Sequence, residues 1–292
     1  MLVIRRGGLG DTLLMAPICA AVRRAASARS AAAVDLHFAG VAEFAEVLAI
    51  YAVVDRAMST EDLGLWALGL DDDRGERARA RMSHYAAIVS DDPVVAAHVR
   101  RVPVATFDPR PARDDVPLAL QIAAQLDLTV DLGEASLTTR RLAAAATPHR
   151  PIVLAPGSGG LLKCWPRTRW LELAALLLAA GRAIEIVVGP TECDRDDPRH
   201  WGFAPTATWL TDMPCTLLAR RLEGAAAFVG NDSGTTHLAA MLSVPTVALF
   251  GPSESRVYRP QGAQVAVVGR RTEGPPNVRV AEVLAALDAV MV

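Results

Sequence analysis

The sequence predicts an α/β protein with two doubly wound parallel sheets, one in each half of the chain. Short apolar runs that resemble buried parallel strands alternate with helix-like segments along the whole chain. The 292 residues are enough for two domains of ordinary size. The composition, 51% hydrophobic and 21% charged, is that of a globular protein with packed cores rather than of a disordered one.

In the first half, the alternation begins with an apolar run at the start of the sequence. The strands that we expect here are residues 2–5, 34–38, 53–54, 86–89 and 103–107. The helices that we expect are residues 13–26, 41–51, 74–81 and 116–126. This order implies a parallel sheet that helices cover on both faces.

The second half restarts the same alternation after an expected linker at residues 129–150, so we expect domains at residues 1–140 and 150–292. The expected strands are residues 152–154, 184–188, 226–229, 245–250 and 265–268. The expected helices are residues 169–180, 217–222, 235–242 and 280–290, with a loop at 189–192. The carboxyl ends of the strands are expected to face a shared central cleft, where ligands bind to such sheets.

Charge and cysteine content exclude several classes of function. The formal net charge is −2 and the pI about 6.3, so nothing favours a nucleic-acid partner. The four cysteines lack zinc-site spacing and are expected to be reduced. Met1 leads directly into a strand, which predicts no secretory signal, and the apolar stretch 173–181 is too short to span a bilayer. We expect a cytoplasmic protein, with peripheral contact at the inner membrane face left open.

The stretch from Gly230 to Ala240 indicates an anion-binding corner, because it joins a strand-like run to a helix through a Gly-Asn-Asp-Ser-Gly turn. The first N–H groups of such a helix lack internal partners, and the positive end of the helix dipole points into the turn. Asp232 or Ser233 can cap the helix, and Gly234 allows a phosphate to approach the backbone. The structural alternative is an ordinary capped strand-to-helix turn.

A second glycine- and serine-rich loop, from Ala155 to Pro166, contains Lys163, the single lysine of the chain. All the other basic residues among the 30 lysines and arginines are arginine. A lysine kept among arginines suggests a compact ammonium charge that a planar guanidinium cannot replace, such as one aimed at a diphosphate. A chance lysine on the surface is the alternative.

The amino-terminal turn, residues 6–12, departs from the known nucleotide-binding loops. Gly8 and Gly10 match the first two glycines of the G-x-G-x-x-G fingerprint, but Leu13 stands at the third position, and no Walker pattern follows. A nicotinamide dehydrogenase is therefore the weakest functional option. Asp11 puts a carboxylate where those folds bring a phosphate, which predicts that this turn serves a different part of a reaction. Capping of the following helix is the structural alternative for Asp11.

Taken together, residues 7–17, the loop from Pro156 to Pro166 and the stretch from Gly230 to Pro252 resemble glycosyltransferase family 9 in order and spacing. The resemblance implies the GT-B-like fold, with two doubly wound domains facing a central cleft, and a nucleotide-diphosphate-sugar donor held mainly by the C-terminal domain. It also implies inverting transfer of a heptose or related sugar without a catalytic metal or other cofactor. The heptosyltransferases of the family suggest an ADP-linked donor and a part in lipopolysaccharide biosynthesis.

The resemblance also implies roles for individual residues. Asp11 is the expected catalytic base, in an acceptor-side loop that contains Gly8 and Gly10. The residues expected to hold the donor diphosphate are Ser158, Gly159 and Lys163 on one side and Ser233, Gly234 and Thr235 on the other. The residues expected near the donor nucleotide or sugar are Glu192 on the ribose, Asp232 orienting the sugar or the loop, and His237, which either lines the site or packs in the helix.

Alternatives stay open for the reaction and for the acceptor. The same fold supports a sugar-nucleotide epimerase that eliminates and re-adds the nucleotide, and also a non-catalytic sugar-nucleotide-binding protein. The expected acceptor is a hydroxyl group of a glycan or of a lipid-linked molecule. Because the first half of the chain has no lysine and no evident basic patch, a small glycan, a different lipid or a protein hydroxyl also fits.

Overall fold

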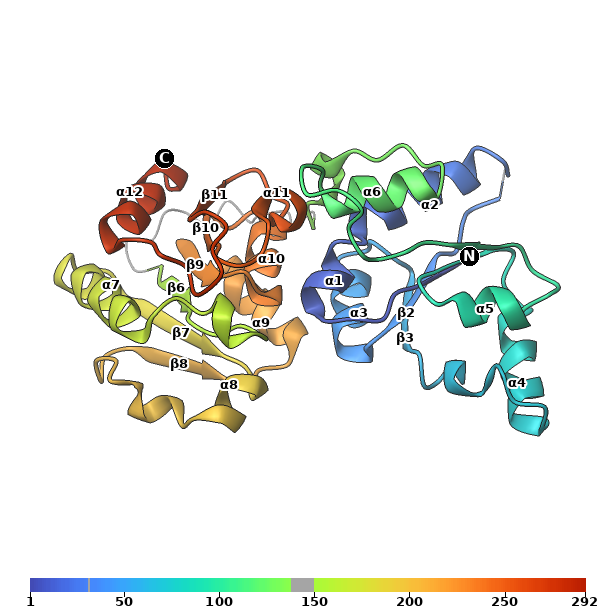
Figure 1. Cartoon of the computed structure of the whole chain (residues 1–292), viewed down its shortest axis with the longest axis horizontal. Helices are drawn as coiled ribbons and strands as arrows, with labels where there is room; N and C mark the ends of the chain where they lie inside the picture. Colours follow the sequence, from blue (N-terminus) through green and yellow to red (C-terminus); the bar gives the residue numbers. More distant parts are fainter. Residues whose placement is uncertain (31, 138–149) are drawn as a thin grey trace. The chain divides into compact units, whose positions relative to one another are not determined.

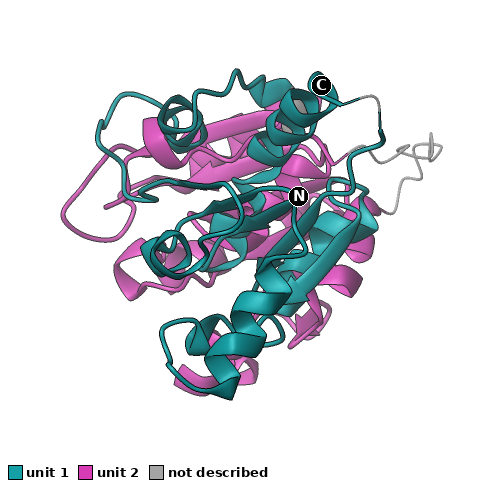
Figure 2. Ribbon diagram, turned by 90° about the vertical axis from the view of Figure 1, so that its right-hand side faces the viewer, with its two compact units in different colours: residues 1–135 teal, residues 136–292 magenta. Residues whose placement is uncertain are grey.

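The computed structural model describes residues 1–30, 32–137 and 150–292. These residues form two compact units, 1–135 and 136–292, drawn in two colours in Figure 2. Each unit contains one all-parallel sheet with helices packed on it (Figure 1), which confirms the fold class expected from the alternation of strands and helices. The expected domain boundary at residue 140 and most of the expected linker lie outside the described residues.

The sheet of the first unit has five strands in the order β3-β2-β1-β4-β5. The strands are β1 (Leu2–Ile4), β2 (His37–Gly40), β3 (Arg56–Ser59), β4 (Ile88–Ser90) and β5 (Val104–Thr106). The helices are α1 (Leu9–Leu13), α2 (Ala16–Ser27), α3 (Ala42–Ile50), α4 (Asp73–Met82), α5 (Pro93–His98) and α6 (Leu118–Gln125), with the 3₁₀ helices η1 (Leu65–Ala67) and η2 (Leu132–Ala135). The strand order reverses between β1 and β4, which makes this pair the topological switch point.

The central strand β1 is buried on both of its faces. Leu2, Val3 and Ile4 are all 0% exposed, and Leu2 and Ile4 belong to one core cluster with Met82 and Val95. A strand that is apolar on both faces is typical of a parallel sheet covered on both sides. The burial of β1 fixes the position from which the loop at residues 5–8 begins.

The sheet of the second unit has six strands in the order β11-β10-β9-β6-β7-β8. The strands are β6 (Ile152–Ala155), β7 (Ile184–Val188), β8 (Thr208–Thr211), β9 (Ala227–Asn231), β10 (Thr246–Leu249) and β11 (Val265–Val268). The helices are α7 (Arg167–Ala179), α8 (Pro190–Arg195), α9 (Cys215–Glu223), α10 (Gly234–Met241), α11 (Ser255–Tyr258) and α12 (Val280–Val290), with η3 (Leu161–Lys163) and η4 (Pro198–Trp201). Here the order reverses between β6 and β9.

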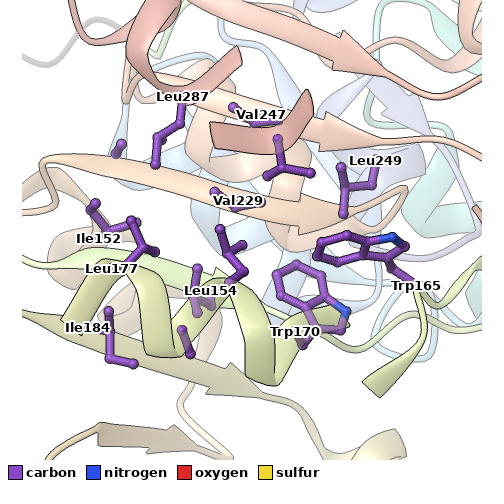
Figure 3. Packing of buried hydrophobic residues seen from close by; sticks show 14 of the residues in the cluster. Ile152, Leu154, Trp165, Trp170, Leu177, Ile184, Val229, Val247, Leu249 and Leu287 are labelled. Atoms are coloured by element: carbon purple, nitrogen blue, oxygen red, sulfur yellow. The ribbon is translucent and has the colours of Figure 1, made fainter. Parts of the chain in front are cut away.

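Two tryptophans lie in the core beside the carboxyl end of this second sheet (Figure 3). Trp165 and Trp170 are 2% and 1% exposed, and their rings meet edge to face with centroids 5.1 Å apart. Trp165 Nε1 donates a hydrogen bond to the Val278 carbonyl oxygen at 3.0 Å. Among the described residues, Trp170 Nε1 has no hydrogen-bond partner. The loop that contains Lys163 is therefore held in the core at its end by the buried ring of Trp165.

Two expected elements near the start of the chain differ from the structure. The expected helix at 13–26 begins only at Ala16, as α2, and Pro17, which has no N–H group, occupies its first turn. A separate short helix, α1, covers residues that were mostly expected to form the preceding turn. The expected strand at 34–38 begins only at His37. The Leu36 N–H group donates to the Asp55 carboxylate at 2.8 Å rather than to a neighbouring strand.

Two other segments were assigned wrongly. Val53 and Val54 form no strand, because Ala52 has a φ of 57° and turns the chain, so β3 begins at Arg56. The expected loop at 189–192 enters helix α8, whose first residue is a proline.

The short elements α5, β8 and α11 were not expected at all. The β8 strand lies at the edge of its sheet, and only one of its four residues is buried, so it lacks the apolar run by which the other strands were recognised. In the described part of the chain, no helix combines the length and the hydropathy that crossing a membrane requires.

Replacing Trp165 by Phe should cost more stability than the matching replacement of Trp170. Both substitutions shrink a buried ring, but only Trp165→Phe removes the donor to the Val278 carbonyl oxygen. A buried acceptor left without its donor costs about 1–3 kcal/mol, so the free energy of unfolding should fall by about that much more for Trp165→Phe. Urea titration followed by far-UV circular dichroism measures both losses, and equal losses would contradict the importance of this hydrogen bond.

Candidate functional site

The two predicted anion-binding loops of the second unit meet at the carboxyl edge of its sheet. β6 and β9 are neighbouring parallel strands, and Ala155 pairs in register with Gly230. The chain continues from β6 to β7 on one side of this pair and from β9 to β10 on the other. Both loops therefore leave the sheet at its switch point, where doubly wound folds bind ligands.

Side-chain hydrogen bonds join the two loops. The Asn231 amide nitrogen donates to the Pro156 carbonyl oxygen at 2.7 Å, and the Asn231 amide oxygen accepts from the Trp165 N–H group at 3.0 Å. The Ser158 hydroxyl donates to the Asp232 carbonyl oxygen at 2.9 Å. Asn231 and Ser158 are both buried. Sequence reasoning missed Asn231, because its partner Pro156 lies 75 residues away in the chain.

The single lysine of the chain forms an ion pair between these loops. Lys163 Nζ lies 2.7 Å from Asp232 Oδ2. The Asp232 side chain is 7% exposed and the Lys163 side chain 39%, so a buried carboxylate holds the ammonium group of a partly exposed lysine. His237 Nε2 lies 4.0 Å from Asp232 Oδ1, and the His237 side chain is buried. The expected proximity of Lys163 to the turn at 230–234 is present.

Neither of the side chains expected to cap α10 does so. Ser233 is the N-cap residue, but its hydroxyl lies 3.0 Å from the Thr235 hydroxyl and 3.2 Å from the Thr236 hydroxyl. The Asp232 carboxylate pairs with Lys163 instead. Among the described residues, no side chain accepts a hydrogen bond from the first N–H groups of α10, so this helix start can serve an anion. The expected cap by Asp232 or Ser233 is therefore wrong.

The turn that enters α10 is too tight for a side chain at Gly230. A Cβ atom there would overlap the Thr236 hydroxyl and lie 2.6 Å from the Phe228 ring. The Thr236 hydroxyl itself donates to the Asn231 carbonyl oxygen at 2.5 Å. Gly230 thus lets the first turn of α10 pack directly on the end of β9.

Glu192, which was expected to hold a ribose, lies in the first turn of α8. Its Oε2 accepts from the Gly189 N–H group at 3.1 Å. The carboxylate packs against Gly157, where a Cβ atom would overlap it, so Glu192 lies beside the loop that follows β6. It also lines a cavity of about 580 Å³ together with Trp165 and Trp201. The ribose contact stays a prediction.

A residue that sequence reasoning missed holds the backbone of this loop. Arg195, the last residue of α8, donates from Nη1 to the Ser158 carbonyl oxygen at 3.1 Å and from Nη2 to the Gly159 carbonyl oxygen at 2.9 Å. Nothing lies within 4 Å of the place where a Cβ atom of Gly159 would be, so the space beside the loop is open. No sequence pattern distinguishes Arg195 from the other arginines.

In the first unit, Asp11 belongs to α1 and satisfies the start of that helix. Its Oδ2 accepts from the Gly8 N–H group at 3.0 Å, and its Oδ1 accepts from Arg5 Nη2 at 2.6 Å. Asp11 therefore caps the helix to which it belongs, and not the following helix that the structural alternative named. The Asp11 side chain is 40% exposed, and each oxygen keeps a second lone pair for another donor. The catalytic role of Asp11 and the acceptor-side role of Gly8 and Gly10 stay predictions.

Behind Asp11 lies a buried carboxylate that sequence reasoning missed. Asp91 follows β4, and its Oδ2 accepts from Arg5 Nη1 at 3.0 Å and from the Arg6 N–H group at 3.1 Å. The side chains of Arg5 and Asp91 are 10% and 4% exposed. Burial raises the pKa of Asp91, although the hydrogen bonds and charges of Arg5 and Arg6 oppose the shift. Arg5 is therefore shared between a buried carboxylate and the partly exposed one of Asp11.

The predicted site residues thus fall into two groups. The group at the switch point of the second sheet consists of Ser158, Gly159, Lys163, Glu192, Asp232, Ser233, Gly234, Thr235 and His237. The group in the first unit consists of Gly8, Gly10 and Asp11. Within the described ranges, no cluster of three or more histidine, cysteine and carboxylate side chains is arranged to hold a metal ion.

Comparison with known proteins agrees with the resemblance seen in these motifs. The profile described as glycosyltransferase family 9 (heptosyltransferase) matches residues 77–286. Lipopolysaccharide heptosyltransferase 1 of Pseudomonas aeruginosa is 31% identical over 131 residues, which cover 45% of this chain and 37% of that protein. The chain spans half the length, or less, of the curated relatives that it matches.

Solved structures extend the likeness over the whole fold. Escherichia coli heptosyltransferase WaaC with ADP superposes with a TM-score of 0.71 at 20% identity and covers 99% of both chains. E. coli ADP-heptose lps heptosyltransferase II gives a TM-score of 0.69 at 18% identity, with 99% of this chain and 98% of that one covered. At these identities the likeness shows the fold, and it confirms the expected GT-B-like class.

Asp91 should make the stability of the protein depend on pH. A carboxyl group whose pKa is higher in the folded chain than in the unfolded one stabilises the fold while it is protonated. That contribution is fully present below the unfolded pKa, near 3.8, and is lost as the pH rises through the raised pKa of the folded state. Asp91→Asn removes the titration and keeps the acceptor for Arg5 and Arg6.

We therefore expect the free energy of unfolding of the wild-type protein, relative to that of Asp91→Asn, to fall as the pH rises from the unfolded pKa of Asp91 through its raised folded pKa. At higher pH the difference should stay constant. Urea titrations at a series of pH values measure the difference. A difference that does not change with pH would contradict the raised pKa.

Proposed function

We propose that this chain, which belongs to glycosyltransferase family 9, transfers a heptose or related sugar from a nucleotide-diphosphate donor to a hydroxyl group of a glycan or lipid-linked acceptor. The observation that carries the proposal is the Lys163–Asp232 ion pair, formed where the two glycine loops of the second unit meet. Curated relatives named as lipopolysaccharide heptosyltransferases support the sugar, and a similar structure solved with ADP supports an ADP-linked donor.

The donor diphosphate binds between Lys163 and the start of α10. Lys163 supplies a full positive charge, and the N–H groups of Gly234 and Thr235 lie at the positive end of the α10 dipole. Both features oppose the negative charge that grows on the diphosphate as its bond to the sugar breaks. Because these groups supply positive charge on two sides of the leaving group, we propose that transfer needs no catalytic metal or other cofactor.

Asp232 orients the donor rather than attacking it. Its carboxylate is buried and already accepts from Lys163, and the side chain of His237 lies beside it. When a diphosphate draws the ammonium group outward, Asp232 Oδ2 becomes available to accept a hydrogen bond from a sugar hydroxyl. Glu192, one strand further along the sheet, accepts from the ribose hydroxyls, and His237 lines the sugar side of the site.

Asp11 is the base of the transfer. It accepts the proton of the acceptor hydroxyl, the hydroxyl oxygen bonds to the anomeric carbon, and the carbon–oxygen bond to the diphosphate breaks with its electron pair on the nucleoside diphosphate. Attack from the side opposite the leaving group inverts the anomeric configuration. Arg5 and the Gly8 N–H group each hold one carboxylate oxygen of Asp11, which fixes the direction of the remaining lone pairs.

The proposal gives the two halves of the chain different parts of the reaction. Residues 1–140 form the acceptor side, with Gly8 at the start of α1 and Gly10 and Asp11 inside that helix, and residues 150–292 hold the nucleotide sugar. A lipid-linked acceptor in lipopolysaccharide biosynthesis would place the protein in the cytoplasm with peripheral contact at the inner membrane face. No nucleic acid takes part.

Lys163→Ala should weaken ADP binding. The substitution removes a charge-assisted hydrogen bond and leaves the buried Asp232 carboxylate facing the diphosphate, so we expect the Kd for ADP to rise about 10- to 100-fold. Lys163→Arg should recover only part of this, because a planar fork does not replace a compact ammonium group. Arg220→Ala, on the exposed face of α9, removes the same charge elsewhere and is the control. Calorimetric titration with ADP in EDTA measures all four proteins, and an unchanged Kd for both Lys163 variants would refute the diphosphate site.

Asp11→Ala should abolish transfer and leave ADP binding nearly intact. Loss of a general base lowers the rate about 10²- to 10⁴-fold, whereas the ADP site lies in other loops of the chain. Asp72→Ala removes the side-chain cap of α4 in the same unit and controls for a lost helix cap. Donor turnover is measured with and without acceptors. Turnover without any acceptor would indicate an epimerase, and equal loss of transfer and ADP binding in Asp11→Ala would reject the assigned base.

A further inference from the structure

We propose that Arg195 is a positioning residue, which turns two backbone N–H groups of the loop after β6 toward the donor diphosphate. The inference rests on the diphosphate site proposed above and assigns to that site a residue that no motif contains. Arg195 is the last residue of α8 and comes three positions after Glu192. It contacts no donor group itself, because its guanidinium donates hydrogen bonds to backbone carbonyl oxygens.

The guanidinium of Arg195 binds two consecutive peptide groups. Nη1 donates to the Ser158 carbonyl oxygen at 3.1 Å, and Nη2 donates to the Gly159 carbonyl oxygen at 2.9 Å. The two terminal nitrogens of arginine are held in one plane, so they fix both carbonyl groups in nearly the same direction. A lysine ammonium in the same place is a single point charge and lacks this planar fork.

Fixing the carbonyl groups also fixes the N–H groups that follow them. In a planar trans peptide the C=O bond and the next N–H bond point in opposite directions. The N–H groups of Gly159 and Gly160 therefore point away from α8 and are nearly parallel. Within the described residues, neither N–H group donates to another backbone or side-chain acceptor. Two adjacent N–H groups aimed the same way form an anion-binding nest.

The surroundings of the loop leave room for such an anion. Nothing lies within 4 Å of the place where a Cβ atom of Gly159 would be. The Ser158 hydroxyl is already committed to the Asp232 carbonyl oxygen, and the Lys163 ammonium group lies on the Asp232 carboxylate. The loop is thus joined by Ser158 to the turn that follows β9 and by Arg195 to α8, with its free N–H groups between these two attachments.

The position of Arg195 also links two parts of donor recognition. Glu192, the proposed ribose contact, and Arg195 belong to the same six-residue helix. The Glu192 carboxylate packs on Gly157, and Arg195 holds the next two residues of the loop. Loss of Arg195 should therefore weaken the binding of ligands that contain phosphate and leave the binding of a nucleoside without phosphate unchanged.

The test is a titration of Arg195→Gln with three probes: ADP, inorganic pyrophosphate and adenosine. We expect the Kd for ADP and for pyrophosphate to rise by a similar factor, about 5- to 20-fold, because both lose the oriented N–H groups. The Kd for adenosine should stay within about twofold. Arg195→Lys should recover less than half of the lost affinity on a logarithmic scale. Arg199→Gln is the matched control, because Arg199 pairs with Asp197 and touches no part of the loop.

Two results would overturn the inference: unchanged affinity for ADP and pyrophosphate in Arg195→Gln, or equal weakening of all three probes. The ligand-free midpoints of thermal unfolding show whether a variant is folded, and Arg195→Lys is used if the glutamine variant is not. Lys163→Ala, titrated in the same series, separates the two proposals. If Lys163→Ala weakens ADP and Arg195→Gln does not, only the role of Arg195 fails. If Lys163→Ala also leaves ADP unchanged, the diphosphate site itself fails.

Discussion

The register between β6 and β9 is the constraint on which the candidate donor site depends. Ala155 lies directly beside Gly230, so the two loops that follow leave the sheet at the same level. Asn231 and Ser158 then tie the loops together with buried hydrogen bonds. Without this register, Lys163 could not reach a carboxylate 69 residues further along the chain. Strand pairing thus determines which charged side chains of the two loops can contact each other.

The switch point of the first sheet also contains a buried carboxylate paired with a basic side chain, but the surroundings of that basic side chain differ. β1 and β4 are neighbours, and Arg5 after β1 meets Asp91 after β4. In both sheets a buried carboxylate holds a basic side chain at the carboxyl edge. In the second unit that basic side chain reaches solvent, which suits an anionic ligand. In the first unit it is buried and holds a second carboxylate, that of Asp11.

The sequence predicted the elements whose signal is local. The strands at 184–188 and 265–268 and the helix at 280–290 match the structure, because a largely apolar run or a helical period is visible within a few residues. The prediction of a strand at Val53-Val54 was wrong, because these residues follow a positive-φ turn at Ala52 and β3 begins after them. The motif residues around Lys163 and Asp232 were also found by local pattern. Asn231, Asp91 and Arg195 were not, because each acts through a partner at least 36 residues away.

The ion pair of Lys163 has a practical consequence for the handling of this protein. The printed sequence offers one side-chain amine, and that amine lies at the mouth of the candidate donor site with 39% of its side chain exposed. Amine-directed reagents, such as succinimidyl esters or aldehyde fixatives, have no other lysine to modify. Attachment of a dye or a chip surface through lysine would therefore block the site.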